Sequence, residues 1–400
     1  MVLFHRKRPE AADDSTQSIR RKRAPGDVQP QRLKAWQPIL TPKTVLPTFF
    51  LISIIFGPIG GLLIWGSSLV SEMTFDYTDC ETLPKSESNE SLVYHKIPSS
   101  KYSYHLSSSA SKNAQISPPV YAFLNNTGID GFDVSNQLQC IVQFDVPADL
   151  SPSVFMYYKL SNFFQNHRRY VKSLDSDQLR GKGGSTSDLN NGDCKPLGSL
   201  NGTAIYPCGL IANSLFNDTF TNPVLLNTTD TDQVTNETYA FSYTGIAWPG
   251  EHKKYVDTPI GKGYTSVDEI VPPPNWMQRF PNGYNSSNIP NLAADEHFQN
   301  WMRTAGLPTF TKLYGRNDQD TMKKGRYSVI VGLNFPVRPY KGTKSIVIST
   351  VSWIGGKNPF LGWAYVAAAG LFVLLAIAGT ARHLIKPRRL GDMSLLSWNR

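Results

Sequence analysis

The chain has 400 residues, of which 40% are hydrophobic, and carries a formal net charge of +9 at pH 7. Residues 1–43 hold ten Lys and Arg against four Asp and Glu, residues 382–400 hold five against one, and the stretch between holds 25 against 26. Because the basic balance lies in the two tails, it gives no support to a nucleic-acid partner and instead follows the positive-inside pattern of membrane proteins.

Two long apolar blocks, residues 44–71 and 358–381, divide the chain. Neither contains Asp, Glu, Lys or Arg, and both exceed the roughly 20 residues that a helix needs to cross the hydrocarbon core. The first block is too long, and begins too far into the chain, for a cleavable signal peptide. The sequence therefore predicts an integral membrane protein with two spans, both termini in the cytosol, and residues 72–357 on the lumenal or extracellular side.

Residues 1–30 are polar and charged without any periodicity, which predicts disorder. They contain the run Arg20-Arg21-Lys22-Arg23, which is similar to a nuclear-import patch. In a membrane-anchored chain we interpret this run as a solvated determinant of topology. The alternative is attraction to the anionic phospholipid membrane, which is worth about 1 kcal/mol per basic side chain near the surface.

Small residues mark a possible packing face on each apolar block. In the first block two glycines four positions apart share one helix face, the proline beside the first is expected to kink the helix, and Gly60 and Gly66 widen the groove. In the second block two glycines lie about two turns apart. We expect close packing against a membrane helix of a partner protein, although lipid also tolerates small residues. The candidate residues are Gly57, Pro58, Gly61, Gly362 and Gly370.

Four cysteines and seven Asn-x-Ser/Thr acceptors lie between the two blocks. Disulfides persist in oxidising compartments, and glycans are added only to translocated chain, so both agree with the predicted topology. The alternative is unpaired buried thiols and unused acceptors. Four cysteines allow three pairings. The residues are Cys80, Cys140, Cys194 and Cys208, and Asn89, Asn125, Asn201, Asn217, Asn227, Asn236 and Asn285.

The stretch between the blocks contains several strand patterns. Residues 72 to about 115 are rich in Ser, Tyr and charged groups and predict irregular chain. Apolar residues alternate over 138–146, 326–337 and 345–353, which is typical of half-buried strands, whereas residues 298–305 have the spacing of one helix face. We therefore predict one large, mainly antiparallel β-sandwich with helical insertions.

No catalytic or metal-binding motif is present. A P-type ATPase needs a phosphate-accepting Asp followed by Lys-Thr-Gly, and the sequence contains neither this motif nor GxSxG, HExxH or a zinc spacing. We therefore predict no enzyme and no cofactor. Two basic clusters, His167 to Lys172 and Glu251 to Lys254, suit acidic partner loops or lipid phosphates, or are solvated helix faces with their aromatic neighbours in the core.

Six long blocks of the sequence carry a family resemblance: Gln31–Phe50, Tyr157–Ser173, Pro207–Thr219, Ile246–Tyr255, Asn300–Gly315 and Gly342–Tyr365. In this order they resemble the cell-division-cycle-fifty/Lem family, in its fungal type, over most of residues 31–390. The resemblance implies an accessory, or beta, subunit of type IV P-type ATPases, the phospholipid flippases. It also implies the same lumenal fold, and it favours a Cys194–Cys208 disulfide, which leaves Cys80 to pair with Cys140.

From this resemblance we expect a noncatalytic partner that forms a heterodimer with a flippase alpha subunit. It would help the ATPase to fold, leave the endoplasmic reticulum and complete its transport cycle, and so support phospholipid asymmetry. The membrane could be that of the endoplasmic reticulum, Golgi or trans-Golgi, endosome or cell surface. The alternatives are a two-span ion-channel subunit with a large glycosylated ectodomain, and a tethered lumenal enzyme. The apolar blocks lack charged residues, which argues against a conduction path formed by this chain alone.

Overall fold

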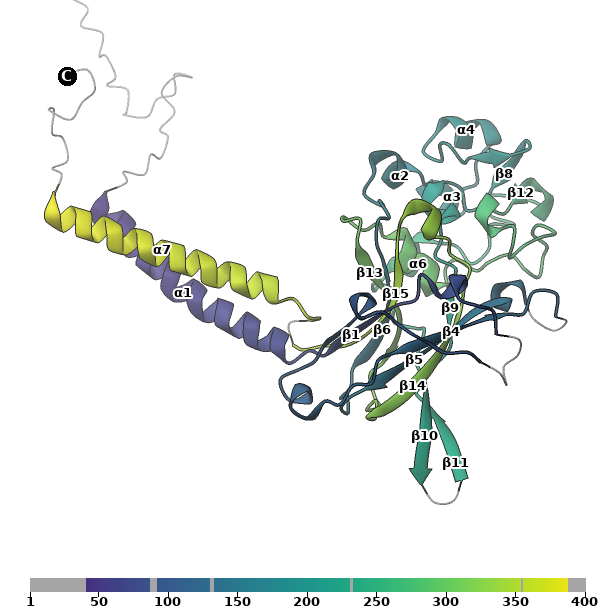
Figure 1. Ribbon diagram of the computed structural model, residues 1–400. Helices are drawn as coiled ribbons and strands as arrows, with labels where there is room; N and C mark the ends of the chain where they lie inside the picture. The colour runs from purple at the N-terminus through teal and green to yellow at the C-terminus, as the bar shows by residue number, and fades with distance from the viewer. Residues whose placement is uncertain (1–40, 87–91, 130–132, 231–232, 354, 388–400) are drawn as a thin grey trace, which may run out of the picture. The chain divides into compact units, whose positions relative to one another are not determined.

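The computed structural model describes residues 41–86, 92–129, 133–230, 233–353 and 355–387 (Figure 1). One compact unit contains the described residues up to Ile55 and from Ala368 onward, and a second contains Phe56–Ala367. The expectations for residues 1–30, for Asn89 and for the tail beyond residue 387 lie outside the described residues.

Two helices, α1 (Pro42–Ser68) and α7 (Pro359–Ile385), occupy the two apolar blocks. Each has 27 residues and is long and apolar enough to cross a membrane, so the prediction of two spans is confirmed. Each begins with proline at its first helical position, where the missing N–H would have no helical partner anyway. Helix α1 continues through Pro58 and ends three residues before the predicted boundary, whereas α7 runs four residues beyond it.

Between the helices the chain forms two larger sheets whose strand pairs are antiparallel. The first sheet has the order β13 (Phe310–Asn317), β6 (Val154–Leu160), β15 (Lys344–Thr350), β1 (Glu72–Asp76) and β3 (Tyr102–His105). The second has the order β11 (Gln233–Thr238), β10 (Val224–Asp230), β14 (Gly325–Gly332), β5 (Leu138–Val146), β4 (Val120–Asn125) and β2 (His95–Lys96), and β9 (Thr219–Phe220) also pairs with β14.

The inward-facing side chains of these two sheets form the first hydrophobic core. Phe75 of β1 stacks on Phe144 of β5 with their ring centroids 4.4 Å apart, so the two sheets meet directly. Met156 of β6 and Val329 of β14 are fully buried in the same core. The alternating apolar residues therefore face one another across the two layers, and the predicted antiparallel β-sandwich is confirmed.

A second core lies under the segments that connect the sandwich strands. It contains the buried side chains of Leu189, Tyr206, Trp276 and Phe298. The elements around it are short: α2 (Arg168–Lys172), α3 (Ser176–Leu179), α4 (Thr186–Asn191), α5 (Leu210–Asn213), α6 (Glu296–Met302), and the sheet of β12 (Ile270–Val271), β8 (Thr203–Ile205) and β7 (Ser199–Leu200). The expected helical insertions thus carry a core of their own, next to the sandwich.

The prediction of irregular chain over residues 72–115 is wrong. Strand β1 lies between β15 and β3 in the first sheet, and its residues Met73 and Phe75 are fully buried. The apolar alternation of β1 covers five residues, and the Ser-rich and charged chain that follows masks it. Tertiary pairing with β15, far away in the sequence, determines this strand.

The late strands are also shorter than predicted. β14 ends at Gly332 because the backbone N–H groups of Asn334 and Phe335 donate to the carboxylate of Asp218, each at 2.6 Å, and not to a neighbouring strand. β15 ends at Thr350 instead of residue 353. The predicted buried face of β14 is nevertheless correct, and it continues through Leu333 and Phe335.

Candidate functional site

Two disulfides hold the two cores. Cys80 bonds to Cys140 in the first core, with their Cα atoms 6.0 Å apart, and Cys194 bonds to Cys208 in the second, with Cα atoms 5.6 Å apart. All four residues are buried. This is the pairing that the family resemblance implies.

The acceptor asparagines occupy accessible positions in the described part of the chain. Asn201, Asn217, Asn236 and Asn285 are exposed, and Asn125 is half-buried. The side chain of Asn227, like Asn89, lies outside the part of the chain that the structure describes. The four exposed positions meet the steric requirement for carrying a glycan.

Asp218, next to Asn217, is the centre of a buried polar network. Its carboxylate forms an ion pair with Lys344 of β15, and it accepts a hydrogen bond from the Tyr77 hydroxyl at 2.8 Å as well as the two backbone N–H bonds described above. Burial and the charge of Asp218 raise the pKa of Tyr77 well above its usual value, so its hydroxyl remains a donor. The network joins the segment around Asp218 to three other chain segments inside the sandwich, at Tyr77, at Asn334 with Phe335, and at Lys344.

The face that joins α1 and α7 within residues 56–367 is made by glycines. A Cβ atom on Gly60 would lie 2.8 Å from Val366 Cγ2, and one on Gly362 would lie 2.6 Å from Ile64 Cγ1 and 2.9 Å from its backbone N. These small residues let the two backbones approach closely. Gly362 was expected to pack against a partner protein, but the chain's own α1 already covers it.

The neighbouring glycine face is open. Among the described residues beyond its own helical turn, a Cβ atom on Gly57 or Gly61 would meet no heavy atom within 4 Å, and Pro58 is exposed beside Gly57. The same holds for a Cβ atom on Gly370 of α7. Gly57 and Gly61 are one helical turn apart and therefore lie on the same side of α1. This open face could accept another membrane helix without disturbing the contact between α1 and α7.

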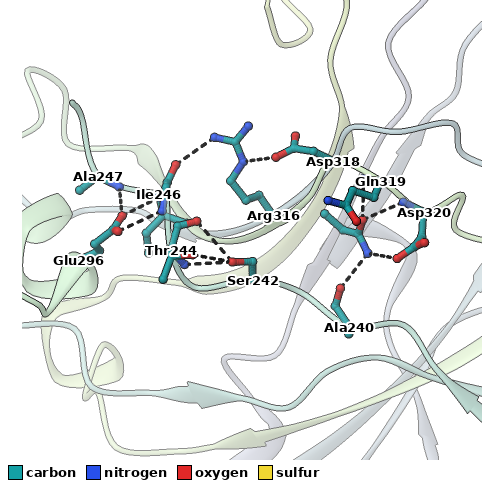
Figure 2. Close-up of polar contacts among 12 residues, drawn as sticks. Ala240, Ser242, Thr244, Ile246, Ala247, Glu296, Arg316, Asp318, Gln319 and Asp320 are labelled. Carbon is teal, nitrogen blue, oxygen red and sulfur yellow. Dashed lines mark hydrogen bonds and ion pairs between the residues drawn. The ribbon is translucent and has the colours of Figure 1, made fainter.

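Figure 2 shows how the segment that precedes Trp248 is held. The Glu296 carboxylate accepts hydrogen bonds from the three successive backbone N–H groups of residues 245–247, at 2.8–3.0 Å. Arg316 donates from Nη1 to the backbone oxygen of Gly245 at 2.9 Å and from Nε to Asp318 at 2.6 Å. The segment is thus fixed from both α6 and β13.

This anchored segment presents an exposed aromatic side chain. Trp248 is 63% exposed, and the Arg303 guanidinium carbon lies 4.2 Å from its ring centroid. His252, Lys253 and Lys254 follow on the surface, and Lys254 forms an ion pair with Glu251 at 2.8 Å. An exposed tryptophan that stacks on an arginine is the kind of residue pair that protein interfaces use.

The basic cluster at α2 divides its side chains between the core and the surface. His167, Arg168, Arg169 and Lys172 are exposed, whereas Phe163 and Tyr170 are partly buried against the first core. Phe164 is exposed. The helix therefore offers a cationic face with one aromatic side chain beside it.

Lys312 of β13 lies in an unusual place for a cation. It is buried, and its Nζ donates to the backbone oxygens of Asn300 and Arg303 at the C-terminal end of α6. Burial, together with the positive charge of Arg303, lowers the pKa of Lys312 to about 8. Its charge complements the helix end, where carbonyl groups lack helical partners.

Sequence reasoning missed several of these residues. It named Gly57 and Gly61 but assigned Gly60 only to the width of the groove, and it did not single out Trp248, Glu296, Arg303 or Asp218. The one available signal was the clustering of Trp, Pro, Gly and Glu in Ile246–Tyr255. In the described part of the chain, no group of three or more His, Cys, Asp or Glu could hold a metal ion.

Comparison with known proteins gives the same family along most of the chain. The pattern of the LEM3 (ligand-effect modulator 3) family / CDC50 family matches residues 63–389. The phospholipid-transporting ATPase accessory subunit CRF1 of Saccharomyces cerevisiae is 40% identical over 400 residues, covering 100% of this chain and 95% of that protein.

Other relatives extend the similarity to distant organisms. The phospholipid-transporting ATPase accessory subunit CDC50 of Chaetomium thermophilum is 38% identical over 379 residues, covering 92% of this chain and 89% of that protein. Cell cycle control protein 50A of Mus musculus is 36% identical over 356 residues, covering 87% of this chain and 85% of that protein. The match to CRF1, which covers the whole chain, includes both long apolar helices and the sandwich.

Proposed function

This chain belongs to the LEM3/CDC50 family, and from that membership we propose that it is the noncatalytic accessory subunit of a phospholipid-transporting P-type ATPase. The observation that carries the proposal is the family match over residues 63–389, together with relatives whose names state this role. The ATPase supplies the phosphate-accepting aspartate that this sequence lacks. None of these relatives is named as a channel, so the channel alternative has no support.

The partner in this proposal is the multi-span alpha subunit, and the complex is a heterodimer within the phospholipid membrane. Inside the bilayer, the open face with Gly57 and Gly61 on α1 supports close helix packing. Outside it, Trp248 with Arg303 and the cationic face of α2 support contacts with acidic loops of the partner. The chain thereby helps the ATPase to fold, leave the endoplasmic reticulum and complete its transport cycle.

The proposed topology puts residues 1–43 and 382–400 in the cytosol and residues 72–357 in the lumen or outside the cell. The basic tails and the exposed acceptors Asn201, Asn217, Asn236 and Asn285 support it. Glycosidase treatment should lower the apparent mass, and replacing all seven acceptor asparagines should abolish that shift. Glycosylation of an acceptor engineered into residues 1–30 would contradict this topology.

The functional proposal is tested in cells that express the cognate ATPase with and without this chain. Without the chain, the ATPase should stay in the endoplasmic reticulum, and the phospholipid asymmetry of later membranes should be reduced. Normal export of the ATPase in the absence of this chain would reject the proposed role. Residence in Golgi, endosomal or surface membranes should then follow that of the ATPase.

A further inference from the structure

A cavity of about 450 Å³ opens where the two cores of the lumenal domain meet. Aromatic side chains from both cores line it: Tyr158 and Phe216 from the first, which stack with centroids 3.9 Å apart, and Trp276 from the second. A concave site of this size, with an apolar wall and a few polar groups, suits a small organic group.

The polar groups of this cavity favour an uncharged ligand. The lining includes the cation Arg279 and the carboxylates of Asp133 and Asp295, while the Asp218 carboxylate is already paired with Lys344. Burial lowers the pKa of His297, which disfavours the charged form of its imidazole. The lining therefore has no cationic excess that would select a phosphate or carboxylate, but it has several hydrogen-bonding groups.

One residue of the cavity lining, Asn217, is a predicted glycan acceptor. It is an exposed acceptor in the sequence Asn217-Asp218-Thr219, and it lines the cavity. Its backbone oxygen accepts a hydrogen bond from Asn334 Nδ2 at 3.2 Å, Asp218 is fixed by its ion pair, and Thr219 pairs in register with Gly332. The acceptor is therefore held at the cavity by the residues on its C-terminal side.

We propose that this cavity is the binding site for the first N-acetylglucosamine residue of a glycan attached to Asn217. The proposal rests on the proposed lumenal placement of residues 72–357. The apolar C–H face of the sugar packs against the aromatic wall, and its hydroxyl and acetamido groups bond to the polar rim. Because the sugar is tethered at the cavity, its effective concentration is high, and even a weak intrinsic affinity keeps it bound.

The attachment itself comes before folding. In the transfer, Asn217 Nδ2 gains a bond to the anomeric carbon of the sugar and loses one proton, and the lipid diphosphate of the oligosaccharide donor leaves. The transferase needs the acceptor in flexible chain, whereas Asp218 and Thr219 are fixed once the sandwich has formed. The cavity consequently closes around a sugar that is already present.

The test is site-resolved deglycosylation of the full-length chain, co-purified with its ATPase in detergent. Peptide N-glycosidase in ¹⁸O-water releases each glycan and marks its asparagine, which mass spectrometry then reads at Asn217, Asn236 and Asn285. We expect release at Asn217 to be at least about tenfold slower than at the other two in the native protein, and equal to them after denaturation. Equal native rates would overturn the proposal.

A variant of the rim provides the matched control. Gln278 and Arg279 are exposed residues of the cavity lining, so the double change Gln278→Ala with Arg279→Ala opens the cavity. It also removes the contact of the Arg279 guanidinium with the Phe280 ring of the second core, 5.2 Å from the ring centroid, and leaves the buried side chains of both cores in place. It should speed native release at Asn217 alone, whereas Lys182→Ala, at a different cavity, should change no rate. Unchanged slow release in the double variant would mean that the cavity is not what protects the glycan.

Which asparagines carry a glycan tells a failure of this proposal apart from a failure of the topology on which it rests. Glycans on Asn236 and Asn285 with none on Asn217 would overturn the proposed sugar-binding site and leave the lumenal placement intact. A chain without any glycan would overturn the lumenal placement and, with it, the proposed sugar-binding site.

Discussion

Lys344 forms an ion pair with Asp218 in the interior of the sandwich: Nζ lies 2.7 Å from Oδ2, and the two side chains are 3% and 0% exposed. Lys344 also donates to the backbone oxygen of Phe335 at 2.9 Å. Asp218 in turn fixes the chain that leaves β14. The pair therefore joins the first residue of β15 to the segment around Asp218 and to the chain that follows β14.

Breaking this pair should destabilise the protein strongly. Lys344→Met leaves a buried carboxylate without its cation, which typically costs about 3–5 kcal/mol. The matched control is Lys182→Ala, which removes an ion pair to Asp177 whose side chains are 65% and 55% exposed, and which should cost no more than about 1 kcal/mol. Thermal unfolding of the purified full-length protein measures both changes. Similar small effects in the two variants would contradict the structural role of the pair.

The Glu296 anchor should control the mobility of the segment before Trp248. Glu296→Gln removes the charge from an acceptor of three backbone N–H bonds, each worth about 1.5–3 kcal/mol when the acceptor is charged. Hydrogen exchange at residues 245–247 should become at least about tenfold faster, while exchange in β5 stays unchanged. As a control, Glu251→Gln breaks only the ion pair with Lys254. Equal protection in wild type and Glu296→Gln would reject the anchor.

The glycines of α1 should separate two kinds of helix packing. Gly57→Leu with Gly61→Leu adds bulk to the open face and should weaken co-purification with the ATPase by about tenfold or more while leaving the chain folded. Gly60→Leu clashes with Val366 and should instead disturb the pairing of α1 with α7. Co-purification measures assembly with the ATPase, and a crosslink between α1 and α7 measures the pairing of the two helices. Full assembly by the double variant would shift the partner contact to the domain between α1 and α7.

Lys312 should give the stability of the folded protein a specific pH dependence. Its pKa is about 8 in the folded protein, below the roughly 10.4 of an unfolded lysine. Between these values the unfolded chain binds more protons, so this group makes stability rise with pH, by at most about 1.4 kcal/mol per unit. Lys312→Met should remove that slope between pH 8 and 9.5. The same slope in the variant would contradict the lowered pKa.

The sequence predicts the parts of this fold that depend on composition and local period. Charge-free blocks of more than 20 residues identify α1 and α7, and the alternation in β5 and β14 identifies the sandwich faces. Positions of glycines restrict where helices can approach, but Gly57, Gly60 and Gly61 are equally small. Only the packed structure distinguishes the covered glycine from the two open ones.

The remaining features depend on contacts between distant residues, so no local pattern reports them. Strand β1 becomes an inner strand because β15 pairs with it on one side and β3 on the other. The helices around the second core have four to seven residues, which is too short for a clear period. Glu296 reaches its three amides 49–51 residues earlier in the chain. Asp218 reads in the sequence as the variable middle residue of a glycan acceptor, and only the fold reveals its buried partner.

The most direct measurement is the composition and activity of the complex that forms around this chain. A tagged chain, expressed at its natural level and extracted in mild detergent, should bring down one multi-span P-type ATPase in equal amount. That complex should hydrolyse ATP when mixed phospholipids containing phosphatidylserine are added, and the chain purified by itself should hydrolyse none. Recovery of the chain as a homo-oligomer without any ATPase, or ATP hydrolysis by the chain alone, would contradict the proposed function.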